Sequence, residues 1–297
     1  MTTPSTTTPS ALQRRGVAAY TSPRFVALGH DFDLDCDDAE LGSYLGALFS
    51  PLAGPGQAAH HYHLSVSAAA ADLWFDDRRL CGQVPTHRAV AVLLWHINGQ
   101  VIARSDRFVR LHAGGVARAG DAVLIPGEME AGKSTLTAGL VRAGLDYLSD
   151  ELVAVDPDDG HLEGFPRAVS LDPGAWLAFA EVRPRLTERL ARSLPYQWQV
   201  PADVLRPGSV VRRARPATIV APRLEPGAAL RLERLPAQQV LVTLASVTFD
   251  LDGDPGRNLA VLGQLARTCP AYRLTFGDVR PAVAAVLDLM HASDPVR

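Results

Sequence analysis

The segment GEMEAGKST at residues 127–135 constrains the fold most strongly, because it fits the spacing G-x-x-x-x-G-K-[ST] of a phosphate-binding loop. The apolar run AVLIP precedes it and predicts a strand. Residues 134–143 follow it and place Leu136, Leu140 and Val141 on one face of a predicted helix, with Gly144 at its end. Between a strand and a helix, the amides of such a loop and the positive end of the helix bind phosphates.

The loop also contains the chain's single lysine. Of the 29 basic residues, 28 are arginines and one is Lys133. A compact ammonium reaches β and γ phosphates in a way that a planar guanidinium does not. We therefore expect ATP and Mg²⁺ as cofactors, with Lys133 on the phosphates and the hydroxyl of Ser134 on the metal. The expected nucleotide-binding residues are those of the whole segment: Gly127, Glu128, Met129, Glu130, Ala131, Gly132, Lys133, Ser134 and Thr135.

An acidic pair follows the next predicted strand, which covers residues 145–148. Asp150 and Glu151 stand directly after it. Because adjacent parallel strands end at the same edge of a sheet, we expect this pair to face the phosphates. One acid could accept a hydroxyl proton and the other could hold Mg²⁺. The alternative interpretation is a solvated turn that happens to contain two acids.

The segment from Leu111 to Asp156, LHAGGVARAGDAVLIPGEMEAGKSTLTAGLVRAGLDYLSDELVAVD, resembles the core of the HPr serine kinase/phosphorylase family. Relatives in that family phosphorylate peptides or small molecules in biosynthetic clusters. The resemblance covers residues 105–172 and extends more weakly to the C-terminus, whereas residues 1–100 show no match. It implies an α/β fold with a mixed sheet, built on a P-loop core of the HPr kinase and phosphoenolpyruvate carboxykinase type.

The resemblance also implies roles for single residues. Asp150 matches the family's catalytic base, and Glu151 matches the neighbouring acid that would hold Mg²⁺. His112 matches a histidine before the loop and is a candidate catalytic residue, although a packed histidine is the alternative. Arg167, in the recurrent segment FPRAVSL, is expected to touch phosphate or substrate, against the alternative of a surface arginine.

Three departures from the family pattern narrow the expected activity. Met129 and Glu130 stand where the usual loop has Ser-Gly, and Glu151 replaces a second aspartate. The signature E-[apolar]-R-G-[apolar]-G of the bifunctional enzymes is missing from the chain. Its absence argues against phosphorylase activity and against HPr as the substrate.

These observations predict a kinase that transfers the γ-phosphate of ATP to a hydroxyl, foremost a serine, of a peptide, a protein or a small molecule. Two alternatives remain open. Glu128 and Glu130 beside the phosphates suit a nucleotide-binding scaffold of a peptide-modifying cluster, without catalysis, whose docking surface would be the first 100 residues. A plain P-loop ATPase would use water as the acceptor. The family's usual hexamer also leaves a homo-oligomer open.

Composition excludes several other classes. The net charge of −3 gives no support for nucleic-acid or membrane binding. The longest apolar run, residues 89–95, is far shorter than the ~20 residues that span a bilayer. The N-terminus shows no secretory signal, and the scattered Cys36, Cys81 and Cys269 suggest neither a zinc ribbon nor a disulfide framework. A cytoplasmic location is the simplest expectation.

The predicted organisation is a disordered tail at residues 1–20, an N-terminal α+β module at 21–100 and a P-loop kinase-like domain at 101–297. In the module we expect a helix near 37–49 and strands near 24–28, 62–67, 73–76 and 89–94. In the domain we expect strands at 108–117, 217–221, 230–235 and 271–276, a hairpin beginning at LVAV, and helices at 176–191, 237–247, 257–268 and 279–291.

Two further clusters carry weaker signals. His60, His61 and His63 suggest a metal site, and alternation puts His61 and His63 on one face of a strand, but we find no nearby cysteine or aspartate that completes the site. Arginines in the segment at 206–215 could capture an acidic peptide or a phosphate; a solvated loop is the alternative. These arginines are Arg206, Arg212, Arg213 and Arg215.

Overall fold

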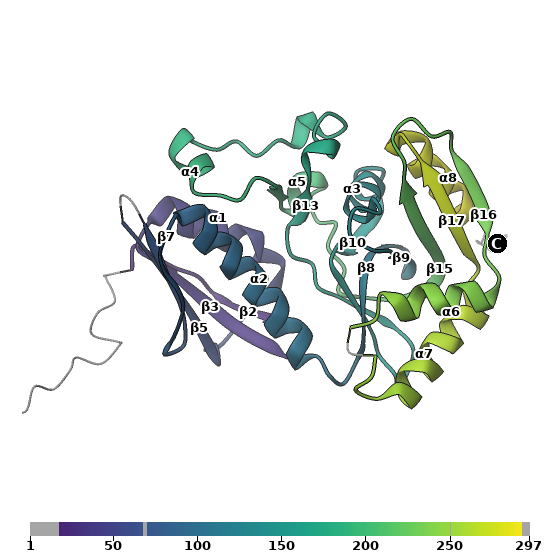
Figure 1. Cartoon of the computed structure of the whole chain (residues 1–297), viewed down its shortest axis with the longest axis horizontal. Helices are drawn as coiled ribbons and strands as arrows, with labels where there is room; N and C mark the ends of the chain where they lie inside the picture. Colours follow the sequence, from purple (N-terminus) through teal and green to yellow (C-terminus); the bar gives the residue numbers. More distant parts are fainter. Residues whose placement is uncertain (1–17, 68–69, 250, 293–297) are drawn as a thin grey trace, which may run out of the picture. The chain divides into compact units, whose positions relative to one another are not determined.

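The computed structural model describes residues 18–67, 70–249 and 251–292 (Figure 1). Most of the tail predicted at residues 1–20 lies outside the described residues. The chain has a mixed α/β architecture and divides into two compact units. Among the described residues, the first unit contains those up to Val26, His30–Gly99 and Arg185–Pro195, and the second contains Ala27–Gly29, Gln100–Pro184 and those from Tyr196 onward.

The first unit is built on a seven-stranded sheet with the order β4-β2-β3-β5-β6-β7, in which β1 also pairs with β3. Strands β3 and β5 run parallel, while β5, β6 and β7 form an antiparallel meander. The strands are β1 (Tyr20–Thr21), β2 (Arg24–Ala27), β3 (His30–Cys36), β4 (Ala53–Gly54), β5 (His60–Val66), β6 (Ala71–Phe75) and β7 (Arg78–Val84). The helices are α1 (Ala39–Leu48), α2 (Thr86–Arg104, which continues into the second unit) and α4 (Glu188–Arg192).

The strand predicted at residues 89–94 is wrong, because this segment lies inside α2. The buried residues of α2 recur at helical spacing, as in Val90, Leu93, Ile97 and Val101, so the apolar run fills one stripe of a helix. Trp95, on the other side of the helix, is exposed. A run of seven apolar residues satisfies both periods, and only the continuation to Val101 distinguishes them.

The second unit has an eight-stranded mixed sheet with the order β10-β8-β11-β12-β15-β17-β16, and β9 pairs with both β8 and β15. Strands β9 and β17 run parallel to β15, and the other pairs are antiparallel. Part of this sheet closes on itself, because each strand in the series β8, β11, β12, β15 and β9 pairs with the next and β9 pairs again with β8. The strands are β8 (Val109–Arg118), β9 (Asp121–Pro126), β10 (Asp146–Ser149), β11 (Leu152–Val155), β12 (Leu162–Gly164), β15 (Arg213–Leu224), β16 (Arg231–Arg234) and β17 (Ala271–Phe276).

Helices pack on both sides of this sheet. Alternate residues of β9 point to opposite faces. Val123 and Ile125 join a core with α3 and α8, whereas Ala122 and Leu124 join a second core with α6 and α7 (Figure 1). The helices of this unit are α3 (Lys133–Arg142), α5 (Ala202–Leu205), α6 (Ala237–Ser246), α7 (Pro255–Thr268) and α8 (Val279–Ala292), and a small separate sheet pairs β13 (Val169–Leu171) with β14 (Trp198–Val200).

The long helix predicted at 176–191 is wrong. The chain there forms short 3₁₀ turns at Pro173–Ala175 and Ala180–Val182, and only α4 is α-helical. Pro184 disfavours helical geometry at the residue before it, and the Thr187 side chain then accepts a hydrogen bond from the Leu190 amide to start a new helix. The other helices and strands expected in the second unit are confirmed, with ends that shift by a few residues.

Among the residues that the structure describes, no helix combines the length and the apolar character that a bilayer crossing requires.

Candidate active site

The loop between β9 and α3 is held against the sheet by close packing at Gly132. This glycine is the N-cap of α3 and has a φ of +93°. A Cβ at this position would stand 2.9 Å from Leu224 Cβ on β15 and 3.0 Å from Phe276 Cζ on β17. No side chain caps α3, so the unpaired amides of its first turn remain available to an acceptor. The site therefore has the backbone donors that a polyphosphate needs.

Lys133 begins α3 and is buried, with 6% of its surface exposed. Its ammonium donates a hydrogen bond to the Glu128 carbonyl oxygen at 2.7 Å, so the side chain folds back over the loop. Burial lowers the pKa of Lys133 below its ordinary value, and the carboxylates of Glu151, Asp150 and Glu128 act in the opposite direction. The loop lysine and the acidic pair therefore belong to one electrostatic cluster.

Asp150 directly follows β10, but β10 is not the neighbour of β9. Strand β8 lies between them and is antiparallel to both, so β9 and β10 run in the same direction without being adjacent. The expectation of adjacent strands is thus wrong. Strands β9 and β10 still run in the same direction, because each of them is antiparallel to β8.

The Asp150 carboxylate is buried and well satisfied. It accepts hydrogen bonds from the Tyr147 hydroxyl at 2.9 Å and from the Ser170 amide at 3.1 Å. Burial raises the pKa of the Asp150 carboxyl above its ordinary value, while the Arg167 guanidinium acts to lower it. Asp150 is thereby joined to β13 through Ser170.

Arg167 lies inside the protein, which excludes the surface arginine considered above. One terminal nitrogen donates to the Ala168 carbonyl oxygen, to Ser170 Oγ and to Gln199 Oε1, at 3.1–3.3 Å. The other donates to Glu151 Oε2 at 3.3 Å. Burial alone lowers the pKa of Arg167, but the carboxylates of Asp150 and Glu151 raise it above its ordinary value. The guanidinium therefore neutralises part of the charge of the acidic pair.

His112, on β8, contacts Glu151 from the other side. Its Nδ1 lies 3.1 Å from the Glu151 carbonyl oxygen and 3.7 Å from Glu151 Oε1. Because a carbonyl oxygen only accepts, the neutral ring carries its proton on Nδ1 and its lone pair on Nε2. Nε2 is buried and has no hydrogen-bond partner among the described residues. Burial and the charge of Lys133 lower the pKa of His112, and Glu151 opposes them.

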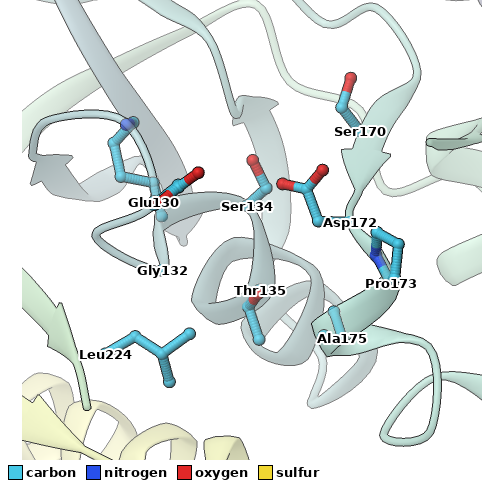
Figure 2. A pocket seen from close by; sticks show the side chains of 11 residues that line it. Glu130, Gly132, Ser134, Thr135, Ser170, Asp172, Pro173, Ala175 and Leu224 are labelled. Carbon is cyan, nitrogen blue, oxygen red and sulfur yellow. The ribbon is translucent and has the colours of Figure 1, made fainter. Parts of the chain in front are cut away.

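A pocket of about 360 Å³ opens over the first turn of α3 (Figure 2). Glu130, Gly132, Lys133, Ser134 and Thr135 line it from the loop side. The opposite side is formed by the segment from 170 to 175, and Leu224 contributes from β15. Figure 2 shows the Asp172 carboxylate and the Ser134 hydroxyl facing one another.

Sequence reasoning missed Ser170, Asp172 and Leu224. Ser170 lies within the FPRAVSL segment and Asp172 within the Asp-Pro-Gly turn that follows it, so the composition of the turn was the available signal. Leu224 carries no such signal, because only strand pairing brings it to the loop.

Other predicted site residues stand apart from the pocket. Met129 is 83% exposed. Gly127, Glu128 and Ala131 belong to the loop but do not line the pocket. The acidic pair, His112 and Arg167 form a cluster next to the pocket that is joined to it through Lys133 and Ser170.

The arginines of the 206–215 segment are engaged within the protein. Arg206 contacts Asp146, Arg213 contacts Asp159 and Glu163, and Arg215 contacts Asp121.

No family model matches the chain, and no curated protein matches it. Among solved structures, the HPr(Ser) kinase/phosphatase from Coxiella burnetii aligns with 62% of this chain and 94% of its own chain, at 14% sequence identity and a TM-score of 0.30. A score and an identity at this level do not establish a shared fold. The function of this chain therefore has to be inferred from its own side chains.

Proposed function

We propose that the chain is an ATP- and Mg²⁺-dependent phosphotransferase that uses a hydroxyl group, foremost that of a serine, as acceptor. The observation that carries this proposal is the hydrogen bond from the Ser170 amide to the Asp150 carboxylate, because Ser170 lines the same pocket as Lys133 and Ser134. A candidate base and a candidate phosphate-binding element therefore adjoin one pocket.

The residues fit a nucleotide polyphosphate. The first turn of α3 offers uncapped amides, Gly132 leaves no side chain in the way, and the pocket lies directly above. Phosphate oxygens would replace the Glu128 carbonyl as acceptors for the Lys133 ammonium. Bound ATP and Mg²⁺ would supply the transferable phosphoryl group and the charge that neutralises it.

Asp150 is the candidate base. A buried carboxylate whose pKa is raised holds a proton more strongly than an exposed one, which suits it to accept a proton from a hydroxyl near neutral pH. Its bonds to Tyr147 and Ser170 fix its orientation. The buried Arg167 limits the accumulation of negative charge from Asp150 and Glu151.

The proposed metal ligands are Ser134 and Glu151. A serine hydroxyl and a carboxylate are oxygen donors of the kind that Mg²⁺ prefers. Glu151 keeps 29% of its side chain exposed, so it can turn toward an incoming ion. His112, bonded through Nδ1 to the Glu151 backbone, would hold this residue in place.

The test uses purified chain with Mg²⁺-ATP and a panel of serine peptides, free serine and small alcohols. Mass spectrometry of the products follows addition of about 80 Da, the mass of HPO₃. Asp150→Asn is expected to lower the rate by roughly 10²–10⁴-fold while nucleotide binding survives. Asp146→Asn is the matched control, because Asp146 lies on the same β10 but pairs with Arg206 away from the site.

The other functions give different results in the same experiment. ADP formation that does not depend on any added hydroxyl compound would identify an ATPase. Nucleotide binding without ADP or a phosphorylated product would identify a scaffold. Wild-type turnover in Asp150→Asn would overturn the assignment of the base.

A further inference from the structure

We propose that the first unit contains a binding site for a divalent transition metal, typified by Zn²⁺, formed by Asp35, His61 and His63. One ligand atom from each of the three side chains lies within 4.8 Å of the others. The site belongs to a different unit from the candidate active site and shares no residue with it.

The parallel pairing of β3 and β5 brings these residues together. Asp33 pairs with His61 and Asp35 pairs with His63 in the register of the two strands. Because side chains alternate along a strand, all four share one face of the sheet. Sequence reasoning placed the two histidines on a common face but could not find the aspartate, which lies on another strand 26 and 28 positions earlier in the chain.

Asp33 orients His61 for a metal. The Nδ1 atom of His61 lies 2.6 Å from Asp33 Oδ1, a distance at which the ring N–H donates to the carboxylate. In the neutral ring the lone pair is then on Nε2, which lies 3.5 Å from Asp35 Oδ2. A lone pair and a carboxylate repel each other unless a cation lies between them. Histidines that bind metals characteristically donate their other N–H to a carboxylate in this way.

The charges on this face also favour a cation. Asp33, Asp35 and Asp37 follow one another on it, and within the described residues no lysine or arginine forms an ion pair with any of them. One oxygen of Asp35 is buried and has no hydrogen-bond partner there. The histidines contact these acids but carry charge only when protonated.

The dimensions suit a small ion that enters from solvent. A tetrahedral ion with bonds of about 2.1 Å holds its ligand atoms roughly 3.4 Å apart. His61 and Asp35 already have this spacing, so the third ligand needs only a small side-chain adjustment. The side chains of His61 and Asp35 are 30% and 24% exposed, so an ion can reach them from solvent. The His63 side chain is buried, with 2% of its surface exposed. Two imidazoles favour zinc or another late first-row ion over Mg²⁺.

The test is a titration of the full chain, first stripped of metal by a chelator, with Zn²⁺ in competition with a chromophoric chelator. We expect one equivalent of Zn²⁺ to bind with high affinity. His61→Ala and Asp35→Asn should each abolish it, and Asp33→Ala should weaken it roughly 10–100-fold because His61 loses its orienting carboxylate. His60→Ala is the matched control, because its ring lies on the opposite face and pairs with Asp76. Circular dichroism confirms that each variant is folded.

A second variant separates this site from the candidate active site. Glu151→Gln should still bind one equivalent of Zn²⁺ with high affinity. Titration with Co²⁺ in place of Zn²⁺ should give a visible d–d absorption spectrum that is lost in His61→Ala. The proposal is overturned if wild-type chain binds no Zn²⁺, if folded Asp35→Asn keeps the wild-type affinity, or if the equivalent is lost in Glu151→Gln instead.

Discussion

Replacing Gly132 by alanine tests how tightly the loop between β9 and α3 is held against the sheet. Its φ of +93° lies in the region that L side chains rarely adopt, which costs about 1–2 kcal/mol. The added Cβ would also stand 2.9 Å from Leu224 and 3.0 Å from Phe276, and overpacking of this kind costs about 1–3 kcal/mol. The free energy of unfolding should therefore fall by about 2–5 kcal/mol.

Two other glycines separate these contributions. Gly144, after α3, has a φ of +108° but no atom within 4 Å of its would-be Cβ, so Gly144→Ala should show the backbone cost alone, about 1–2 kcal/mol. Gly174 has neither a positive φ nor a near neighbour, and Gly174→Ala should be neutral or stabilising by about 0.4–1 kcal/mol.

Urea unfolding followed by far-ultraviolet circular dichroism measures all three variants, with nucleotide binding measured in parallel. Gly174→Ala should be the most stable variant, Gly144→Ala should be intermediate and Gly132→Ala should be the least stable. Only Gly132→Ala should also weaken nucleotide binding strongly. A Gly132→Ala protein as stable as Gly144→Ala would show that the loop can move away from Leu224 and Phe276, which refutes the packing argument.

Three other perturbations address the candidate site. Lys133→Arg should lower nucleotide affinity by more than about tenfold, because a planar fork cannot take the place of the buried ammonium; unchanged affinity in isothermal titration would contradict this. The raised pKa of Asp150 means that folding favours the protonated carboxyl. The free energy of unfolding of wild type relative to Asp150→Asn should therefore be greatest below the ordinary pKa of 3.8 and fall as the pH rises toward the pKa in the folded protein. A difference in unfolding free energy that does not change with pH would refute the argument that burial raises this pKa. Arg167→Met should cost about 3–5 kcal/mol because it leaves the buried Asp150 carboxylate without the counter-charge of Arg167, and a loss below about 1 kcal/mol in urea unfolding would show that the stability of the acidic pair does not depend on Arg167.

The parts of the fold that could be predicted from sequence are those with strong local signals. The predicted turn at RAGD joins β8 and β9, with positive φ at Ala119 and Gly120, and α3 ends just before Gly144 as predicted. Asp150 follows β10, which runs in the same direction as β9, but the two strands are not neighbours as predicted, because β8 lies between them.

The parts that could not be predicted depend on contacts between distant segments. Over seven residues, the apolar pattern of the buried face of α2 is the same as that of a buried strand. Pro184 interrupts the segment at 176–191, where the sequence pattern predicts one continuous helix. Leu224 reaches the loop only because β15 pairs with β9 and β17. The aspartate beside His61 and His63 comes from a parallel neighbour, and parallel pairings leave no local trace in the sequence.

The segment Arg185–Pro195 belongs to the first unit, although the chain on both sides of it belongs to the second. Its Arg189 contacts Asp38 and Glu40, and Thr187 donates a hydrogen bond to Glu40 at 2.6 Å. A gene fragment that starts at residue 101 would therefore encode this segment without the surface it covers, and a fragment that stops at residue 100 would leave Asp38 and Glu40 bare. A single cut near residue 100 therefore does not separate the two units intact, because it divides the first unit between the two fragments.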